Sequence, residues 1–200
     1  VAKPLSGLGQ KTMNELADRL ILAKKTNKSR MLTFGAHAIK NGLAPVFIHL
    51  MKEGWVTHLA TNGAGIIHDW EFAFQGHSSE DVRANVDRGE FGIWQETGTY
   101  LNFAIVAGAW KGLGYGESVG AFVGNDGVEV PSQEELVEEI REQAAQNPAQ
   151  AAAAADMLDR VRHFDLKPGF LSVPHPYKKF GVQAAAYRLG VPFTSRYAGA

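Results

Sequence analysis

The chain has 200 residues, of which 45% are hydrophobic and 20% charged, and its formal net charge is -1 at pH 7. This composition is that of a globular protein with its own core, which excludes a disordered chain, and the near-neutral charge argues against a nucleic-acid partner. The absence of cysteine excludes disulfide scaffolds, thiolate catalysis and cysteine-ligated metals.

The first part of the chain predicts a strand, a helix and a second strand. Apolar residues at helical spacing predict a helix over residues 12–25, which we expect to cover one face of a sheet. Residues 31–34 and 56–61 have the pattern of buried strands, and residues 43–52 between them return to helical spacing. A strand, a helix and a strand of these lengths form a right-handed parallel crossover unit.

The remainder of the chain is predicted to be mainly helical. The expected helices cover residues 66–75, 78–89, 93–110, 132–146, 149–163 and 177–189. Residues 169–173 and 191–194 are predicted strands, so the chain is expected to close on a second strand, helix, strand unit. Glycines from 108 to 120 predict a flexible or tightly turned segment. The fold class predicted is α/β: a Rossmann-like open, mainly parallel sheet with helices on both faces, in a single domain over residues 1–200.

Ligands of open parallel sheets bind beyond the carboxyl ends of the strands, which here precede residues 35–42, 61–65 and 174–179. Small residues at Asn62-Gly63-Ala64-Gly65 would let backbone N–H groups approach a phosphate at the start of a helix, although the dinucleotide fingerprint spacing is absent. A plain tight turn is the alternative interpretation. Lys40 is either a phosphate or carboxylate partner or a solvated lysine, and Lys178 with Lys179 suggests a solvated or anion-binding pair.

Two further polar features leave alternatives open. Asp69 could accept hydrogen bonds from a ribose or an amine, or could complement the dipole of its own helix. Four histidines, His37, His49, His58 and His68, raise a metal hypothesis, but no known ligand spacing such as HExxH is present. We therefore expect no metal site.

Two stretches resemble the deoxyhypusine synthase family. One is Leu32-Thr33-Phe34-Gly35 through Gly42-Leu43, continuing to Thr61, Gly63 and Asp69, where that family has a strand, a loop ending in Gly-Leu, a helix, a strand, a Thr-Ala-Gly-Gly turn and an acidic pair. The other is Gly181 to Phe193, which is similar to the family's Ala-Tyr helix followed by Gly-Ile-Pro. The matches frame about 160 residues but are concentrated at the two ends of that span.

The resemblance implies a Rossmann-like fold that binds NAD, a homotetramer, and an NAD-dependent aminobutyl transferase or other polyamine-modifying enzyme acting on an amine substrate. Carried over by position, the cofactor-binding residues would be Ala36, His37, Asn41, Gly42, Thr61, Asn62, Gly63, Ala64 and Asp69. The family's imine-forming lysine lies in a Gly-rich Lys-His segment that these 200 residues do not contain. The chain is thus either a fragment or a divergent relative that kept nucleotide binding.

Two alternatives to an NAD enzyme remain from the sequence. One is a non-catalytic oligomeric nucleotide-binding module, and the other is a metal-dependent hydrolase using His37, His68 and Asp69. The sequence has no apolar run of about eighteen residues and no signal-peptide pattern at its start, so no membrane partner and a cytoplasmic location are expected.

Overall fold

A computed structural model of the chain describes residues 4–78, 81–92 and 94–196. It is a mixed helix and strand fold in which helices predominate. The elements in chain order are α1 (Gly7–Lys25), β1 (Met31–Thr33), α2 (Ala36–Lys40), α3 (Ala44–Lys52), β2 (His58–Asn62), α4 (Gly63–Gln75), α5 (Val82–Arg88), α6 (Gln95–Trp110), α7 (Tyr115–Asn125), β3 (Gly127–Val130), α8 (Gln133–Gln143), α9 (Pro148–His163), β4 (Gly169–Ser172), a 3-10 turn η1 (Lys178–Phe180), α10 (Val182–Leu189) and β5 (Phe193–Arg196).

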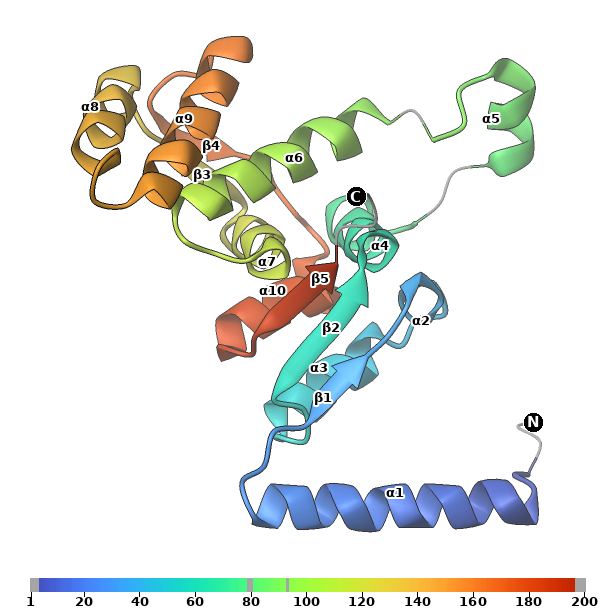
Figure 1. Cartoon of the computed structure of the whole chain (residues 1–200). Coiled ribbons are helices and arrows are strands. Elements are labelled where there is room, and N and C mark those ends of the chain that lie inside the picture. The colour runs from blue at the N-terminus through green and yellow to red at the C-terminus, as the bar shows by residue number, and fades with distance from the viewer. Residues whose placement is uncertain (1–3, 79–80, 93, 197–200) are drawn as a thin grey trace.

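A three-stranded parallel sheet lies at the centre, in the order β1-β2-β5 (Figure 1). Leu32 of β1 lies opposite Leu59 of β2, which lies opposite Phe193 of β5. These three side chains share one face and pack against Phe47 of α3 and Val182 of α10. The predicted first crossover unit is therefore confirmed, because β1 and β2 are parallel neighbours and α3 lies between them in sequence.

The expectation of helices on both faces of this sheet is wrong for the described residues. Met31, Thr33 and Thr194 on the opposite face are all exposed, and Met31 keeps 60% of its surface. A bond at 3.1 Å between His58 Nε2 and the Thr194 hydroxyl also lies on this open face. The helices of the core thus cover the sheet from one side only.

The second predicted crossover unit is also wrong. β4 pairs antiparallel with β3, a strand that the sequence did not predict, in a separate two-stranded sheet. β3 contributes Val130 and β4 the partly buried Leu171 to a second core. In this core Phe103 of α6 packs with Leu136 of α8 and Met157 of α9. In Figure 1 this helical layer lies at the end of the molecule opposite α1.

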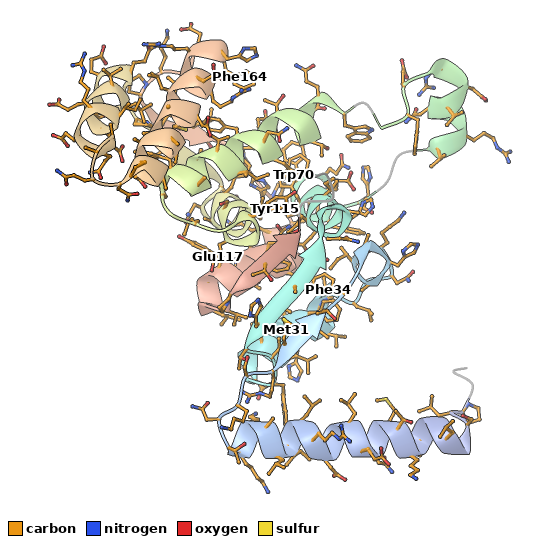
Figure 2. The ribbon with its side chains drawn as sticks, in the orientation of Figure 1. Met31, Phe34, Trp70, Tyr115, Glu117 and Phe164 are labelled. Carbon is orange, nitrogen blue, oxygen red and sulfur yellow. The ribbon has the colours of Figure 1, made fainter. Side chains whose placement is uncertain are left out.

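The predicted helix over residues 12–25 exists as α1, and Ser6 extends it to Gly7 by accepting a hydrogen bond from Gly9 N–H. It covers no sheet, however, and buries none of its residues. Figure 2 shows most of its side chains projecting into open space, whereas Lys24 near its end donates a hydrogen bond to the carbonyl oxygen of Glu53 at 2.7 Å. Its periodicity correctly predicted the helix, but the expected packing is wrong.

The segment predicted to be flexible or tightly turned contains a tight turn over residues 111–114, where Gly112 has a φ of 74°, and it continues as helix α7. Gly116 and Gly120 lie inside α7, where they allow close contact of backbones: a Cβ on Gly120 would lie 2.6 Å from the carbonyl oxygen of Gln183 in α10. Glycine is needed here because helix and neighbour touch through the main chain.

Local capping signals were the most accurate predictions. Ser132 and Glu135 form the expected capping box of α8, and Asn147 caps α9. The short helix predicted over residues 78–89 is α5, capped by Asp81; its Ser79 and Glu80, like Ile93 before α6, lie outside the described residues. Gly181 divides the helix predicted over residues 177–189 into η1 and α10.

Within the described part of the chain, no helix has both the length and the apolar content that crossing a bilayer requires.

Candidate functional site

The carboxyl ends of β1, β2 and β5 meet at one edge of the parallel sheet, and α2 and α4 begin there. This is the edge at which open parallel sheets bind ligands, because loops and helix N-termini converge on it. Figure 2 places Trp70 of α4 and Tyr115 of α7 beside the ends of β2 and β5.

The turn from β2 into α4 is held by two side chains. The Asn62 side chain accepts a hydrogen bond from Gly65 N–H at 2.9 Å and so caps α4. The Thr61 hydroxyl donates to the carbonyl oxygen of Phe34 at 2.8 Å, which fastens the end of β2 to the end of β1. Both predicted residues therefore shape the turn rather than project into open space.

Gly63 and Ala64 form the first turn of α4 and line a cavity of about 320 Å³, which we call the glycine cavity. The nearest atom that a Cβ on Gly63 would meet is the Tyr115 hydroxyl, at 4.0 Å. Gly65 differs, because a Cβ there would overlap the Thr61 side chain. The space beside Gly63 is thus open, whereas Gly65 is required by packing.

A second cavity of about 450 Å³, the histidine cavity, adjoins the first. The two share Ile67 of α4 with Thr97 and Gly98 of α6. Lys40 from the end of α2 and His68 and Glu71 from α4 line the histidine cavity. His68 Nδ1 lies 2.7 Å from Glu71 Oε2, and only 20% and 11% of these side chains are exposed. Together the two cavities form a groove between α4 and α6.

The Thr97 hydroxyl, at the boundary of the two cavities, is buried and has no hydrogen-bond partner among the described residues. A buried polar atom of this kind is costly unless something bonds to it. A ligand in the groove would supply the missing bond.

The predicted cofactor residues are not all brought together. Gly63 and Ala64 line the glycine cavity, whereas the exposed His37 and the half-buried Ala36 lie in the first turn of α2. Asn41 and Gly42 follow the end of α2, and Gly42 lines a third cavity, of about 390 Å³, with Asp69, Phe72, Tyr177 and Phe180. Asn41 and Asp69 therefore line neither cavity of the groove.

Asp69 serves as a cap for a distant helix. Its carboxylate accepts hydrogen bonds from Val182 N–H at 2.8 Å and from Gln183 N–H at 2.9 Å, the first amides of α10. Burial raises the pKa of Asp69 above its ordinary value, and these bonds offset part of the rise. A ribose would have to displace them, so in this fold Asp69 holds α10 in place and is not carried into the proposed site.

The metal hypothesis finds no support. Among the described residues, no group of three or more His, Asp or Glu side chains is arranged to hold a metal ion. His68 bonds Glu71, whereas Asp69 beside it caps α10. The hydrolase alternative with His37, His68 and Asp69 is therefore wrong for the part of the chain that the structure describes.

Lys178 is not a free anion-binding lysine either. It forms an ion pair with Asp126, whose carboxylate also accepts a hydrogen bond from His175 N–H at 2.9 Å. Partial burial opposes the charge of Asp126, but the bonds from Lys178 and His175 hold the pKa of that carboxyl below its ordinary value. Lys179 lies with its ammonium 4.8 Å from the centre of the Phe180 ring. The predicted lysine pair is thus divided between two structural contacts.

Three groups of the groove were not predicted from the sequence: the His68–Glu71 pair, the Thr97 hydroxyl and Tyr115. The spacing of His68 and Glu71 could have predicted their contact, because residues three apart on a helix lie side by side. The other two come from α6 and α7, and no local pattern connects them to α4.

This chain matches no protein-family model, and a search of curated proteins also gives no match. Function is therefore inferred from the geometry of the groove.

Proposed function

We propose that the chain binds NAD in the groove, with the pyrophosphate at the N-terminus of α4 and the sheet serving as a Rossmann-like platform. The observation that carries this proposal is the open first turn of α4 at Gly63 and Ala64, which follows the central parallel strand and borders a cavity. The first amides of a helix lack intrahelical partners and attract anions.

The dimensions of the site support a ligand of this kind. Each cavity of the groove lies within the range of about 300–1,000 Å³ that is usual for ligand pockets. The orphaned Thr97 hydroxyl offers a polar contact midway between them. With its phosphates at α4, a dinucleotide in the glycine cavity would end at this boundary and leave the histidine cavity to a second molecule.

Aminobutyl transfer, which the resemblance implies, receives less support. It needs a lysine that is free to attack the substrate, and Lys178 is ion-paired with Asp126. Lys40 lines the histidine cavity but is exposed. The proposal is accordingly NAD binding by a deoxyhypusine synthase-like protein, without the transfer step.

Calorimetric titration with NAD tests this proposal, and the four tryptophans give an independent fluorescence signal. The test variant is Gly63→Val, whose Cβ would enter the open space beside α4, with the Tyr115 hydroxyl as its nearest neighbour at 4.0 Å. We expect a loss of affinity of about tenfold or more, equivalent to about 1.4 kcal/mol. Gly7→Val is the matched control, because nothing surrounds Gly7 in α1.

Equal affinity in wild type and Gly63→Val would contradict binding at α4. A flat titration of the folded wild-type protein would instead favour the non-catalytic oligomeric module, whose loops no longer hold a cofactor.

We also propose that the chain self-associates, as the resemblance to a homotetrameric family implies. α1 supports this, since it buries no residue yet carries exposed Leu8, Met13, Leu16 and Leu20. A lone helix of this length is marginal in water unless an apolar face is covered. Light scattering should report a mass above 21.7 kDa for wild type and a lower mass for a Leu16→Glu, Leu20→Glu variant.

A further inference from the structure

We propose that the histidine cavity holds the substrate of a hydride transfer to NAD, and that this substrate is an α-hydroxy acid with an apolar side chain. His68 accepts the hydroxyl proton, Glu71 positions His68, and Lys40 binds the carboxylate. The inference rests on the proposed NAD site but adds a reaction and a substrate class to it.

The His68–Glu71 pair has the geometry of a proton acceptor with a fixed ring. The Glu71 carboxylate, 2.7 Å from Nδ1, keeps the proton on that nitrogen and leaves the lone pair on Nε2. Nε2 forms no hydrogen bond with any other described residue. One nitrogen of a histidine that lines a cavity is thus held, and the other is available to a ligand.

The position of the pair relative to the nucleotide follows from the shared wall of the two cavities. Ile67 and Thr97 border both cavities, so a molecule beside His68 lies next to whatever occupies the glycine cavity. The buried Thr97 hydroxyl can bond to the substrate at this boundary. Hydride transfer requires such direct contact between substrate and cofactor.

The charges of the cavity select the substrate. Lys40 contributes a cation that can bind a carboxylate, whereas the negative charge of Glu71 is directed at His68. Val82, Phe91 and Trp94 line the same cavity and provide an apolar wall. An anionic head with an apolar body fits these groups, and a polyamine, whose charges are all positive, does not.

The reaction is balanced with the groups named. The C–H bond beside the hydroxyl breaks and its hydrogen leaves with the electron pair as hydride to NAD, while the O–H proton passes to His68 Nε2 and the carbonyl forms. The products are an α-keto acid, NADH and an imidazolium, which the Glu71 carboxylate stabilises until the proton passes to water.

Phenyllactate is the probe, and phenylethylamine is its cationic counterpart. Calorimetry with the NAD-saturated protein should show binding of phenyllactate, weakened about tenfold or more in Lys40→Met by loss of the charge pair, and no binding of phenylethylamine. Diethyl pyrocarbonate should modify His68 in wild type, and phenyllactate should protect it. This second readout does not depend on turnover.

The reaction itself is followed by the absorbance of NADH. His68→Gln should bind phenyllactate as wild type does but reduce NAD about 10²–10⁴-fold more slowly. Glu71→Gln should lower kcat while the KM for phenyllactate stays near its wild-type value, because an amide holds the proton on His68 Nδ1 less firmly than the carboxylate does; a merely structural role would change both constants or neither. His49→Gln is the control, since His49 is exposed in α3 and lines neither cavity.

Three results would overturn the inference. The first is a protein that binds NAD but neither binds phenyllactate nor reduces NAD with it. The others are turnover at the wild-type rate in His68→Gln, or oxidation of phenylethylamine in place of phenyllactate. Failure of NAD itself to bind would be seen in the first titration. That outcome would remove the proposed function and this reaction together, and is thus distinguished from failure of the substrate assignment alone.

Discussion

Gln183 donates two hydrogen bonds to one carboxylate oxygen of Asp69, from its backbone N–H at 2.9 Å and from its side-chain Nε2 at 3.1 Å. The same Nε2 also donates to the carbonyl oxygen of Ile66 at 3.0 Å. Because Gly181 offers no side chain to cap α10, Asp69 of α4 performs this task across 113 residues of sequence. The contact joins α4, which follows the central strand of the sheet, to α10.

Asp69→Asn should lower the free energy of unfolding by about 2–3 kcal/mol, because an amide turns a donor toward the N–H groups of α10 and leaves one of them unpaired. Urea unfolding measures the loss. Asp156→Asn, an exposed carboxylate on α9, is the matched control and should change stability by less than about 0.5 kcal/mol. Equal stability of the two variants would show that the cap contributes nothing.

The stability difference between wild type and Asp69→Asn should also depend on pH. Burial raises the pKa of Asp69 above 3.8, so its protonated form is favoured in the folded state. The stability that this raised pKa provides is complete below the pKa of Asp69 in the unfolded chain. It is lost as the pH rises through the pKa of Asp69 in the folded state. The stability difference between wild type and Asp69→Asn should therefore shrink as the pH is raised, which urea unfolding at several pH values would show. A difference that grows with pH would contradict the prediction.

The pH dependence of stability that His175 contributes has the opposite sign to that of Asp69. Burial among Trp70, Phe74 and Phe122 lowers the pKa of His175 from 6.5 to about 4, and its Nε2 accepts a hydrogen bond from Trp70 Nε1 at 3.1 Å. The neutral ring stabilises the fold fully above pH 6.5, and this contribution is lost as the pH falls through about 4.

The free energy of unfolding that is lost when the His175 ring becomes protonated amounts to about 3 kcal/mol. The stability advantage of wild type over His175→Gln should decline over this acidic range in urea unfolding experiments. His49→Gln, an exposed histidine of α3, should show no such trend relative to wild type. A constant advantage of wild type over His175→Gln would contradict the assignment of the acid transition to His175.

Two helical glycines should respond in opposite directions to alanine. At Gly120 the new methyl group would lie 2.6 Å from a backbone oxygen of α10, so α7 must move and we expect a loss of about 2–3 kcal/mol. At Gly98 of α6 nothing lies within 4 Å, and alanine should stabilise the helix by up to about 1 kcal/mol. Thermal melts of both variants measure this contrast, and equal effects would refute it.

The sequence predicted what depends on near neighbours. The parallel pair β1 and β2, the turn at Asn62 and the cap at Ser132 all follow from residues within one or two turns of each other. Even the His68–Glu71 pair was visible at this range, but its histidine was considered only as a metal ligand. Local chemistry therefore predicted the turn that borders the candidate site, whereas the binding role of this turn stays a prediction.

The rest could not be predicted because it depends on contacts between distant segments. Periodicity identified the apolar residues of α1 but not whether anything packs on them. Glycines such as Gly120 suggest a turn and a close helix contact equally, and only the position of α10 decides between them. Asp69 was assigned to a ligand because its partners, Val182 and Gln183, lie more than a hundred residues away.

Arg30 fastens α1 to the rest of the molecule. The residue is buried, with only 8% of its surface exposed. Its guanidinium donates hydrogen bonds to the carbonyl oxygens of Ala23 at 3.0 Å, Trp55 at 3.1 Å and Gly54 at 3.2 Å. Since α1 buries none of its own residues, these bonds attach it together with Lys24, whose ammonium donates to the carbonyl oxygen of Glu53 at 2.7 Å and lies 4.0 Å from the centre of the Trp55 ring.

Arg30→Met should therefore release α1 while the sheet and its helices stay folded, because several carbonyl groups lose a charged donor at about 1.5–3 kcal/mol. Digestion with a lysine-specific protease should cut faster after Lys24 and Lys25, and mass spectrometry of the products identifies the sites. Arg19→Met, on an exposed position of α1, should digest like wild type. Arg30→Lys keeps the charge but cannot reach several carbonyls at once, so its cleavage rate should fall between the two. Identical digestion of all three variants would mean that α1 is held by something other than Arg30.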